Sequence, residues 1–241
     1  MSFIITMYVR EGIVMASDSR FTLNTEEHQP DKTTVQIALN QSDTSYKTFL
    51  APDNIGISTF GDADIKGVPI SGYIESFIGE QMQNFENIVD EIPNKLLEYF
   101  KKLQPVPDTQ FHVAGYKEII GGRKEPQVWR VWIAEEKVER INKPDQQGAS
   151  WGGEADIFTR LMQPVAVINQ DGTLNQSLPQ YQIPFRFFTL QDAIDFCIFA
   201  IRSTIDAIRF QPRPKTVGGP IDVLVIKPDK AFWVQRKELH V

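Results

Sequence analysis

The chain has 241 residues, of which 41% are hydrophobic and 23% are charged, as in an ordinary soluble globular protein. Its formal net charge of −6 argues against nucleic acid or an anionic membrane as a partner, since both need a basic surface. One cysteine excludes an internal disulfide and favours a reducing compartment. There is no targeting segment and no run of 18 apolar residues. We therefore expect a cytoplasmic protein with a single domain over residues 1–241.

Strands dominate the first 60 residues. Two apolar, β-branched segments flank Arg10-Glu11-Gly12 and predict a hairpin that begins almost at the first residue. Two more flank Pro52-Asp53-Asn54, which has the composition of a turn. The polar segment 22–44 predicts a long loop instead. The strands expected in this part of the chain are 3–9, 13–18, 47–50 and 55–60.

Helices and further strands follow in blocks. Apolar residues recur at three- or four-residue spacing in four segments, most clearly in the last of them. The helices expected are 64–77, 92–103, 154–162 and 190–209. The strands expected are 111–116, 128–134, 138–141, 165–169, 221–226 and 231–235. Blocks of strands and helices in this order favour α+β layers over an alternating parallel sheet.

The motifs of the common cofactor sites are absent. The chain has no P-loop, no dinucleotide-binding glycine motif and no His-Glu-x-x-His. His28, His112 and His240 are far apart in the sequence, and none has a second ligand beside it. Cys197 lies within the apolar face of a helix and is expected to be a core residue. We expect neither a metal nor an organic cofactor.

The N-terminus carries the most informative chemistry. Ser2 follows the initiator Met, and a small second residue permits removal of that Met by an aminopeptidase. The free α-amine of Ser2 would titrate near pH 8 and can act as general base for its own hydroxyl. Asp18 ends the second strand of the same hairpin, where it can lie beside Ser2. A lysine held there would favour the alkoxide form of the hydroxyl.

These residues carry a family resemblance. Ile13-Val-Met-Ala-Ser-Asp-Ser-Arg20 resembles the second-strand motif of proteasome β-type subunits, in the N-terminal nucleophile hydrolase superfamily, and is most similar in kind to bacterial proteasome-like proteins. The sixteen-residue spacing from Ser2 to Asp18 matches that between the family's nucleophile and its catalytic Asp. Ala149-Ser-Trp-Gly-Gly153 is similar to the family's Gly-Ser-Gly turn, and Gly218-Gly-Pro-Ile-Asp-Val to its Ser-Gly-Gly-x-Ile-Asp-Val segment. The resemblance implies an α+β, four-layer αββα sandwich.

The resemblance also implies roles for individual residues. Ser2 would be the nucleophile, in place of the usual Thr, and Asp18 would orient a catalytic lysine. Lys47 is assigned as that lysine because it opens the third strand, whereas Lys32 fits the plain residue count, and the choice stays open. The oxyanion would be held by the backbone N–H of Ser58.

The function expected from this resemblance is hydrolysis of peptide or amide bonds through an acyl-enzyme, as in threonine-type endopeptidases, by a homo-oligomer that forms a ring. Phe21 and Phe60 are expected to make an apolar substrate pocket. Gly153 replaces the family's supporting Ser, and Pro214 and Val217 replace its Asp-x-x-Ser. These departures keep a second function open, a non-catalytic, ring-forming assembly or binding protein. An amidase with a small non-peptide substrate is a third.

Overall fold

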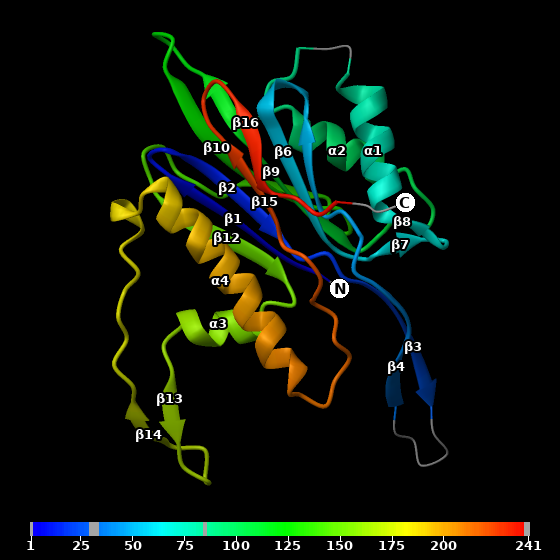
Figure 1. Ribbon diagram of the computed structural model, residues 1–241, viewed down its shortest axis with the longest axis vertical. Coiled ribbons are helices and arrows are strands. Elements are labelled where there is room, and N and C mark those ends of the chain that lie inside the picture. Colours follow the sequence, from blue (N-terminus) through cyan, green and yellow to red (C-terminus); the bar gives the residue numbers. More distant parts are fainter. Residues whose placement is uncertain (1, 29–33, 84–85, 239–241) are drawn as a thin grey trace.

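Two five-stranded antiparallel sheets lie face to face between two pairs of helices (Figure 1). The computed structural model describes residues 2–28, 34–83 and 86–238. Within these ranges it describes the backbone alone for residues 23–28 and 34–41. The first sheet has the strand order β12 (Gly148–Gly153), β1 (Phe3–Val9), β2 (Gly12–Ser17), β15 (Asp222–Ile226) and β16 (Ala231–Gln235). The second has the order β11 (Lys137–Arg140), β10 (Lys124–Trp132), β9 (Thr109–Glu118), β6 (Ile55–Gly61) and β5 (Thr48–Ala51).

The helices cover the outer faces of the sheets. Helices α1 (Ile70–Gln81) and α2 (Ile92–Phe100) pack on the second sheet, and α3 (Asp156–Met162) and α4 (Leu190–Arg209) on the first. A third apolar cluster fills the space between the sheets. Both faces of β1 and β2 are therefore buried, which explains their nearly unbroken apolar sequences. The expected four-layer αββα sandwich is confirmed.

Helix α4 follows the sequence prediction to the residue. Thr189 and Asp192 form a reciprocal capping box at its start, which satisfies backbone N–H groups that would otherwise lack partners. Its apolar face is buried against the first sheet, and Cys197 is fully buried within that face. Burial raises the pKa of the Cys197 thiol, as expected of a core cysteine and not of a nucleophile.

One prediction is wrong. Segment 22–44 contains β3 (Phe21–His28) and β4 (Thr34–Ser42), a two-stranded ribbon that projects from the sandwich (Figure 1). These strands pair with each other and join neither five-stranded sheet. The polar, Thr-rich composition favoured a loop, although Val35, Ile37 and Leu39 alternate along β4 with polar or small residues, a pattern typical of a strand.

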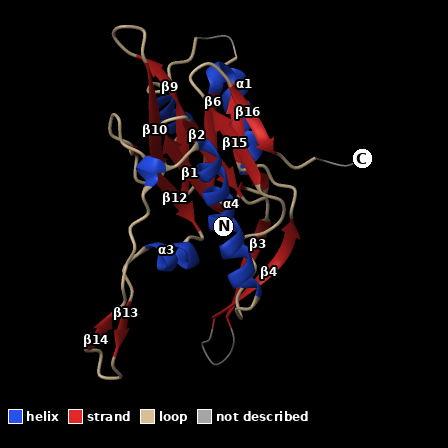
Figure 2. Ribbon diagram, turned by 60° about the vertical axis from the view of Figure 1, so that its left-hand side comes forward, coloured by secondary structure: helices blue, strands red, loops and turns tan. Residues whose placement is uncertain are grey.

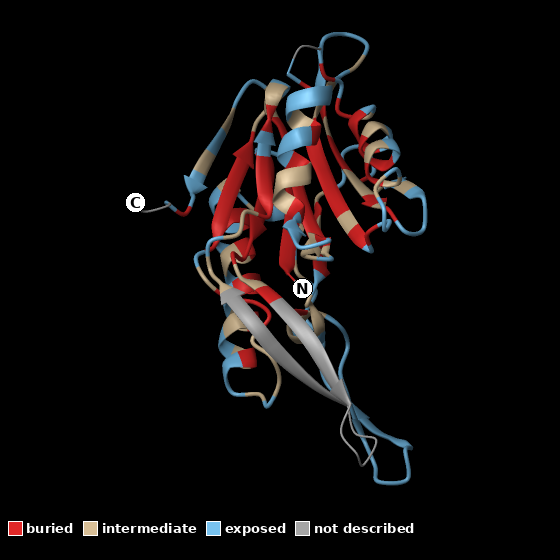
Figure 3. Ribbon diagram, turned by 90° about the vertical axis from the view of Figure 1, so that its right-hand side faces the viewer, coloured by how far each residue is buried: buried red, intermediate tan, exposed pale blue. Residues whose placement is uncertain are grey.

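Several other elements differ in detail, and strands β12 and β14 (Leu174–Ser177) were not expected from the sequence. The helix expected from residue 64 begins at Ile70, because β7 (Asp64–Ile65) and β8 (Val68–Pro69) form a short ribbon first. Strands β13 (Ala166–Ile168) and β14 form an exposed hairpin away from both sheets (Figures 2 and 3). Within the described residues, no helix combines the length and the apolar character needed to span a membrane.

Candidate active site

The carboxylate of Asp18 is the centre of the candidate site. The β1–β2 register pairs Ile4 with Ser17, so Asp18 follows β2 beside the start of β1. Its side chain is fully buried. Oδ1 accepts hydrogen bonds from Lys47 Nζ at 2.7 Å and Phe3 N at 2.9 Å. Oδ2 accepts them from Gly218 N at 3.0 Å and from Arg20 N at 3.1 Å. This buried carboxylate therefore forms one ion pair and accepts from three backbone N–H groups.

Lys47 immediately precedes β5 and is buried, with 4% of its surface exposed. Burial lowers the pKa of the Lys47 ammonium, and the adjacent charge of Asp18 opposes that shift. The nearby ammonium of Lys237 lowers the pKa of Lys47 further. Of the two lysines considered from the sequence, Lys47 donates a hydrogen bond to Asp18, whereas Lys32 lies outside the described residues.

Ser2 immediately precedes β1 and lies against Gly153, at the end of the edge strand β12. Its carbonyl accepts the Glu154 N–H at 2.7 Å, and the next residue, Phe3, donates its N–H to Asp18. Gly153 faces it with φ of +90°, and a Cβ on that glycine would lie 1.8 Å from the Ser2 carbonyl oxygen. Only glycine fits this close approach. The Ser2 backbone is therefore held from both sides.

Two cavities border Ser2. The smaller, of about 10 Å³, is also lined by Lys47, Phe21 and Phe60 and is roughly the size of one water molecule. The larger is an open cleft of about 560 Å³. It is lined by Ser2, Phe60, Gly61, Gln110, Arg130, Trp151, Gly152, Gly153, Glu154, Ala155, Asp156 and Thr159. Phe21 and Phe60, predicted to bind substrate, thus both lie around Ser2.

The direction of backbone N–H groups along β6 bears on the oxyanion donor. The N–H of Thr59 donates to the Lys47 carbonyl at 2.9 Å, on the β5 side, and the N–H of Asp62 donates to the Asp108 carbonyl at 3.0 Å, on the β9 side. N–H groups alternate between the two sides of a strand. Ser58 therefore directs its N–H toward β9, away from Lys47. Ser58 lines neither cavity, and the oxyanion role expected of its N–H stays a prediction.

Gly61 is better placed than Ser58. The same alternation directs its N–H to the Lys47 side of the strand, and Gly61 lines the cleft together with Ser2. Its φ is +109°, and a Cβ here would lie 2.3 Å from the carbonyl oxygen of Asp108. Glycine is needed here because the Asp108 backbone approaches Gly61 closely, and a glycine at the end of a strand is the sequence signal of such an approach.

His112, one of the three histidines, lies in the core between the sheets. Its ring nitrogens bond to Thr6 Oγ1 at 2.9 Å and Ser150 Oγ at 3.3 Å. Burial, aided by the charge of Arg130, lowers the pKa of His112 to about 3, so the ring is neutral at physiological pH. The described residues contain no group of three His, Cys, Asp or Glu side chains suited to a metal ion.

Solved structures of Anbu share this architecture. Two structures of Anbu from Hyphomicrobium sp. strain MC1, one a Gly-1 mutant, align over 98% of this chain and 86–88% of theirs, with TM-scores of 0.61 and 0.60 at 13% and 12% identity. Anbu (ancestral beta-subunit) from Yersinia bercovieri aligns over 96% of this chain and 86% of that chain, with a TM-score of 0.54 and 13% identity. The fold is that of the proteasome-like Anbu structures. The sequence itself matches no protein-family model and no curated protein.

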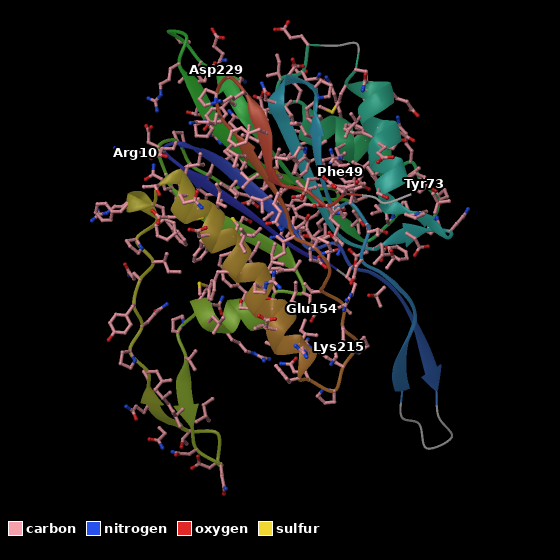
Figure 4. All side chains as sticks on the ribbon, viewed as in Figure 1. Arg10, Phe49, Tyr73, Glu154, Lys215 and Asp229 are labelled. Atoms are coloured by element: carbon pink, nitrogen blue, oxygen red, sulfur yellow. The ribbon has the colours of Figure 1, made fainter. Side chains whose placement is uncertain are left out.

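Within this Anbu fold, a polar network adjoins Ser2 that the sequence analysis missed. Arg213 binds Glu154 Oε1 at 2.6 Å and Asp156 Oδ1 at 3.1 Å, and Thr216 donates to Glu154 Oε2 at 3.2 Å. Figure 4 shows Glu154 close to the C-terminal segment that carries these residues. The polar side chains occur at 213 and 216, beside the positions of the two apolar replacements, Pro214 and Val217. The sequence analysis considered Pro214 and Val217 and passed over the polar residue that precedes each of them.

Proposed function

We propose that this chain is a proteasome-like N-terminal nucleophile hydrolase that cleaves peptide or amide bonds through an acyl-enzyme on Ser2, after removal of Met1. The observation that carries the proposal is the buried Lys47–Asp18 ion pair, which adjoins Ser2 through the Phe3 N–H. Burying two charges costs several kcal/mol per ion, so a buried pair beside a small cavity is more readily explained by chemistry than by stability.

Each group has one role in this reaction. The free α-amine of Ser2 takes the proton of its own Oγ, which attacks the substrate carbonyl. The Lys47 ammonium stabilises the forming alkoxide, and Asp18 holds that ammonium in place. The Gly61 N–H donates to the tetrahedral oxyanion. The amine then protonates the leaving nitrogen, and water hydrolyses the ester on Ser2 to regenerate the hydroxyl.

The mass of the untagged protein tests this proposal directly. The protein is expressed natively, incubated with an electrophilic β-lactone and measured by intact mass spectrometry. We expect a mass lower by one Met and higher by one adduct, which peptide mapping assigns to Ser2. A full-length mass without adduct would contradict the hydrolase.

A second candidate function, a non-catalytic assembly protein, is favoured by one feature. The β13–β14 hairpin exposes apolar side chains: Val167, Ile168 and Leu174 are 44%, 63% and 65% exposed. Exposed apolar groups on a projecting hairpin are typical of contact surfaces between subunits. We propose a homo-oligomer in either case, and light scattering at micromolar concentration tests it, since a monomer would contradict both versions. The unlabelled full-length mass described above would leave the assembly function as the better explanation.

A further inference from the structure

Arg130 is a cation of the cleft that forms no ion pair among the described residues, since Glu139, which lies opposite it in the β10–β11 register, pairs with Lys137. It lies on β10, is half-buried and lines the cleft with Ser2. Two of its N–H groups, on Nε and Nη2, donate to the same oxygen, Gln110 Oε1, at 3.1 and 2.7 Å. A guanidinium has five N–H donors. Among the described residues, none accepts from the other three, and no Asp or Glu lies within ion-pair distance of Arg130.

The guanidinium is also held in one orientation. Its Cζ lies 5.0 Å from the centre of the Phe60 ring and 4.9 Å from that of the Trp132 ring. Burial lowers the pKa of Arg130, which reflects a partly desolvated cation, although Glu135 and Glu139 act on it at longer range. An oriented, partly desolvated guanidinium with free donors is suited to binding a carboxylate through paired hydrogen bonds.

The acidic side chains of the cleft are paired with arginines, so they do not make the cleft selective for cations. Glu154 and Asp156 both bind Arg213, and Asp156 also lies 3.7 Å from Arg160. Their charges are balanced within the protein, so they attract a cationic substrate only weakly. The charge left unbalanced at the cleft surface is that of Arg130.

We propose that Arg130 determines the specificity of the cleft by binding a substrate carboxylate, from an acidic side chain or from a chain terminus. This inference rests on the proposed hydrolase function and names its substrate class, an acidic peptide. Arg130 touches the substrate away from the scissile bond, so it selects substrate without taking part in proton transfer. A charge-assisted, partly desolvated pair of this kind is expected to change kcat/KM by about tenfold or more.

The main test compares substrates that differ only in charge. Acetylated tripeptide 7-amino-4-methylcoumarin amides carry Glu or the isosteric Gln at each of the three positions in turn, with Ala elsewhere. We expect kcat/KM to be at least about tenfold higher for Glu than for Gln at one of the positions. Quenched peptides with a free or amidated C-terminus test the chain-terminus source in the same way. Equal kcat/KM for the Glu and Gln substrates at every position and for the free and amidated C-termini would overturn the proposal. Faster cleavage of substrates that carry Lys in place of Glu would also overturn it.

Variants separate the charge of Arg130 from its packing. Arg130→Met keeps an apolar stem between the rings and should remove the Glu preference, whereas Arg130→Lys keeps the charge and should retain part of it. Arg123→Gln is the matched control, because it removes the same charge from an exposed side chain paired with Asp145. It should leave the preference unchanged. Loss of the preference in Arg123→Gln as well would point to the overall field of the protein and overturn the role of Arg130.

A binding measurement separates this inference from the proposed function. The Ser2→Ala variant is titrated with acetyl-tripeptide amides of the Glu and Gln series, followed by NMR chemical shifts, with and without Arg130→Met. If the Glu peptides bind more tightly than the Gln peptides only when Arg130 is present, and the unaltered protein shows no turnover, the carboxylate site is supported and the hydrolase function is contradicted. If the unaltered protein turns over substrate without any preference for Glu, the hydrolase function is supported and the carboxylate site is contradicted.

Discussion

Lys47 Nζ and Asp18 Oδ1 lie 2.7 Å apart, and the two side chains are 5% and 0% exposed. The pair joins three parts of the chain, because Asp18 also accepts from the N–H of Phe3 in β1 and of Gly218 before β15. The chemistry proposed for Ser2 therefore depends on a contact that also holds the first sheet together at its end.

Replacing the acid of this pair should be costly. Asp18→Asn leaves the Lys47 ammonium buried without a counter-charge, so we expect the free energy of unfolding to fall by about 3–5 kcal/mol. Urea denaturation at pH 7 measures it. Asp43→Asn is the matched control, since Asp43 pairs with Arg20 in a more exposed place, and it should cost less than about 1 kcal/mol. Similar losses in the two variants would contradict a special role for the buried pair.

The hydroxyl of Ser2 should be essential, whereas that of Ser58 should be dispensable. Ser2→Ala should abolish turnover and leave the circular dichroism spectrum and melting temperature unchanged. Ser58→Ala keeps the backbone N–H of residue 58 and removes only a hydroxyl that is buried without a hydrogen-bond partner among the described residues, so turnover should stay intact and stability should be equal or slightly higher. Retained turnover in Ser2→Ala would end the proposed mechanism.

The close approach at Gly153 should be essential to the site. In Gly153→Ala the new Cβ meets the Ser2 carbonyl, so we expect loss of β-lactone labelling together with a drop in stability of more than about 2 kcal/mol. Gly172→Ala carries a similar φ of +83° but meets nothing within 4 Å. It should cost about 1 kcal/mol and leave labelling unchanged. Normal labelling of Gly153→Ala would show that Ser2 tolerates displacement.

His112 should make the protein acid-sensitive. Its pKa in the folded state is about 3, whereas in the unfolded chain it is near 6.5, so between these values the unfolded state binds one more proton. The contribution is fully present above pH 6.5 and is lost as the pH falls toward 3, by about 1.4 kcal/mol per pH unit. Urea denaturation at pH 6.5, 5.5 and 4.5 measures this slope. His112→Gln should show a shallower slope, and identical slopes would contradict the shift.

The sequence alone was enough to predict the local elements and part of the site. Long periodic segments, such as α4, and apolar strands, such as β1, encode their structure in neighbouring residues, so their prediction needs no tertiary contact. The same holds for the nearness of Ser2 and Asp18, because they lie at matching ends of one hairpin. The choice of Lys47 relied on its position at the start of a strand, and its side chain does lie on Asp18.

Only the tertiary structure decided the remainder of the site. Whether the N–H of Ser58 or of Gly61 faces Ser2 depends on the register of β6 between β5 and β9, which a single strand does not reveal. Arg130 of β10 and Glu154, which follows β12, line the same cleft because one sheet packs on the other. The β3–β4 segment was predicted as a loop from its polar composition, although Val35, Ile37 and Leu39 alternate along β4, and the tertiary structure pairs the two strands outside both five-stranded sheets. Local periodicity predicts elements, whereas the meeting of distant strands determines which groups face the substrate.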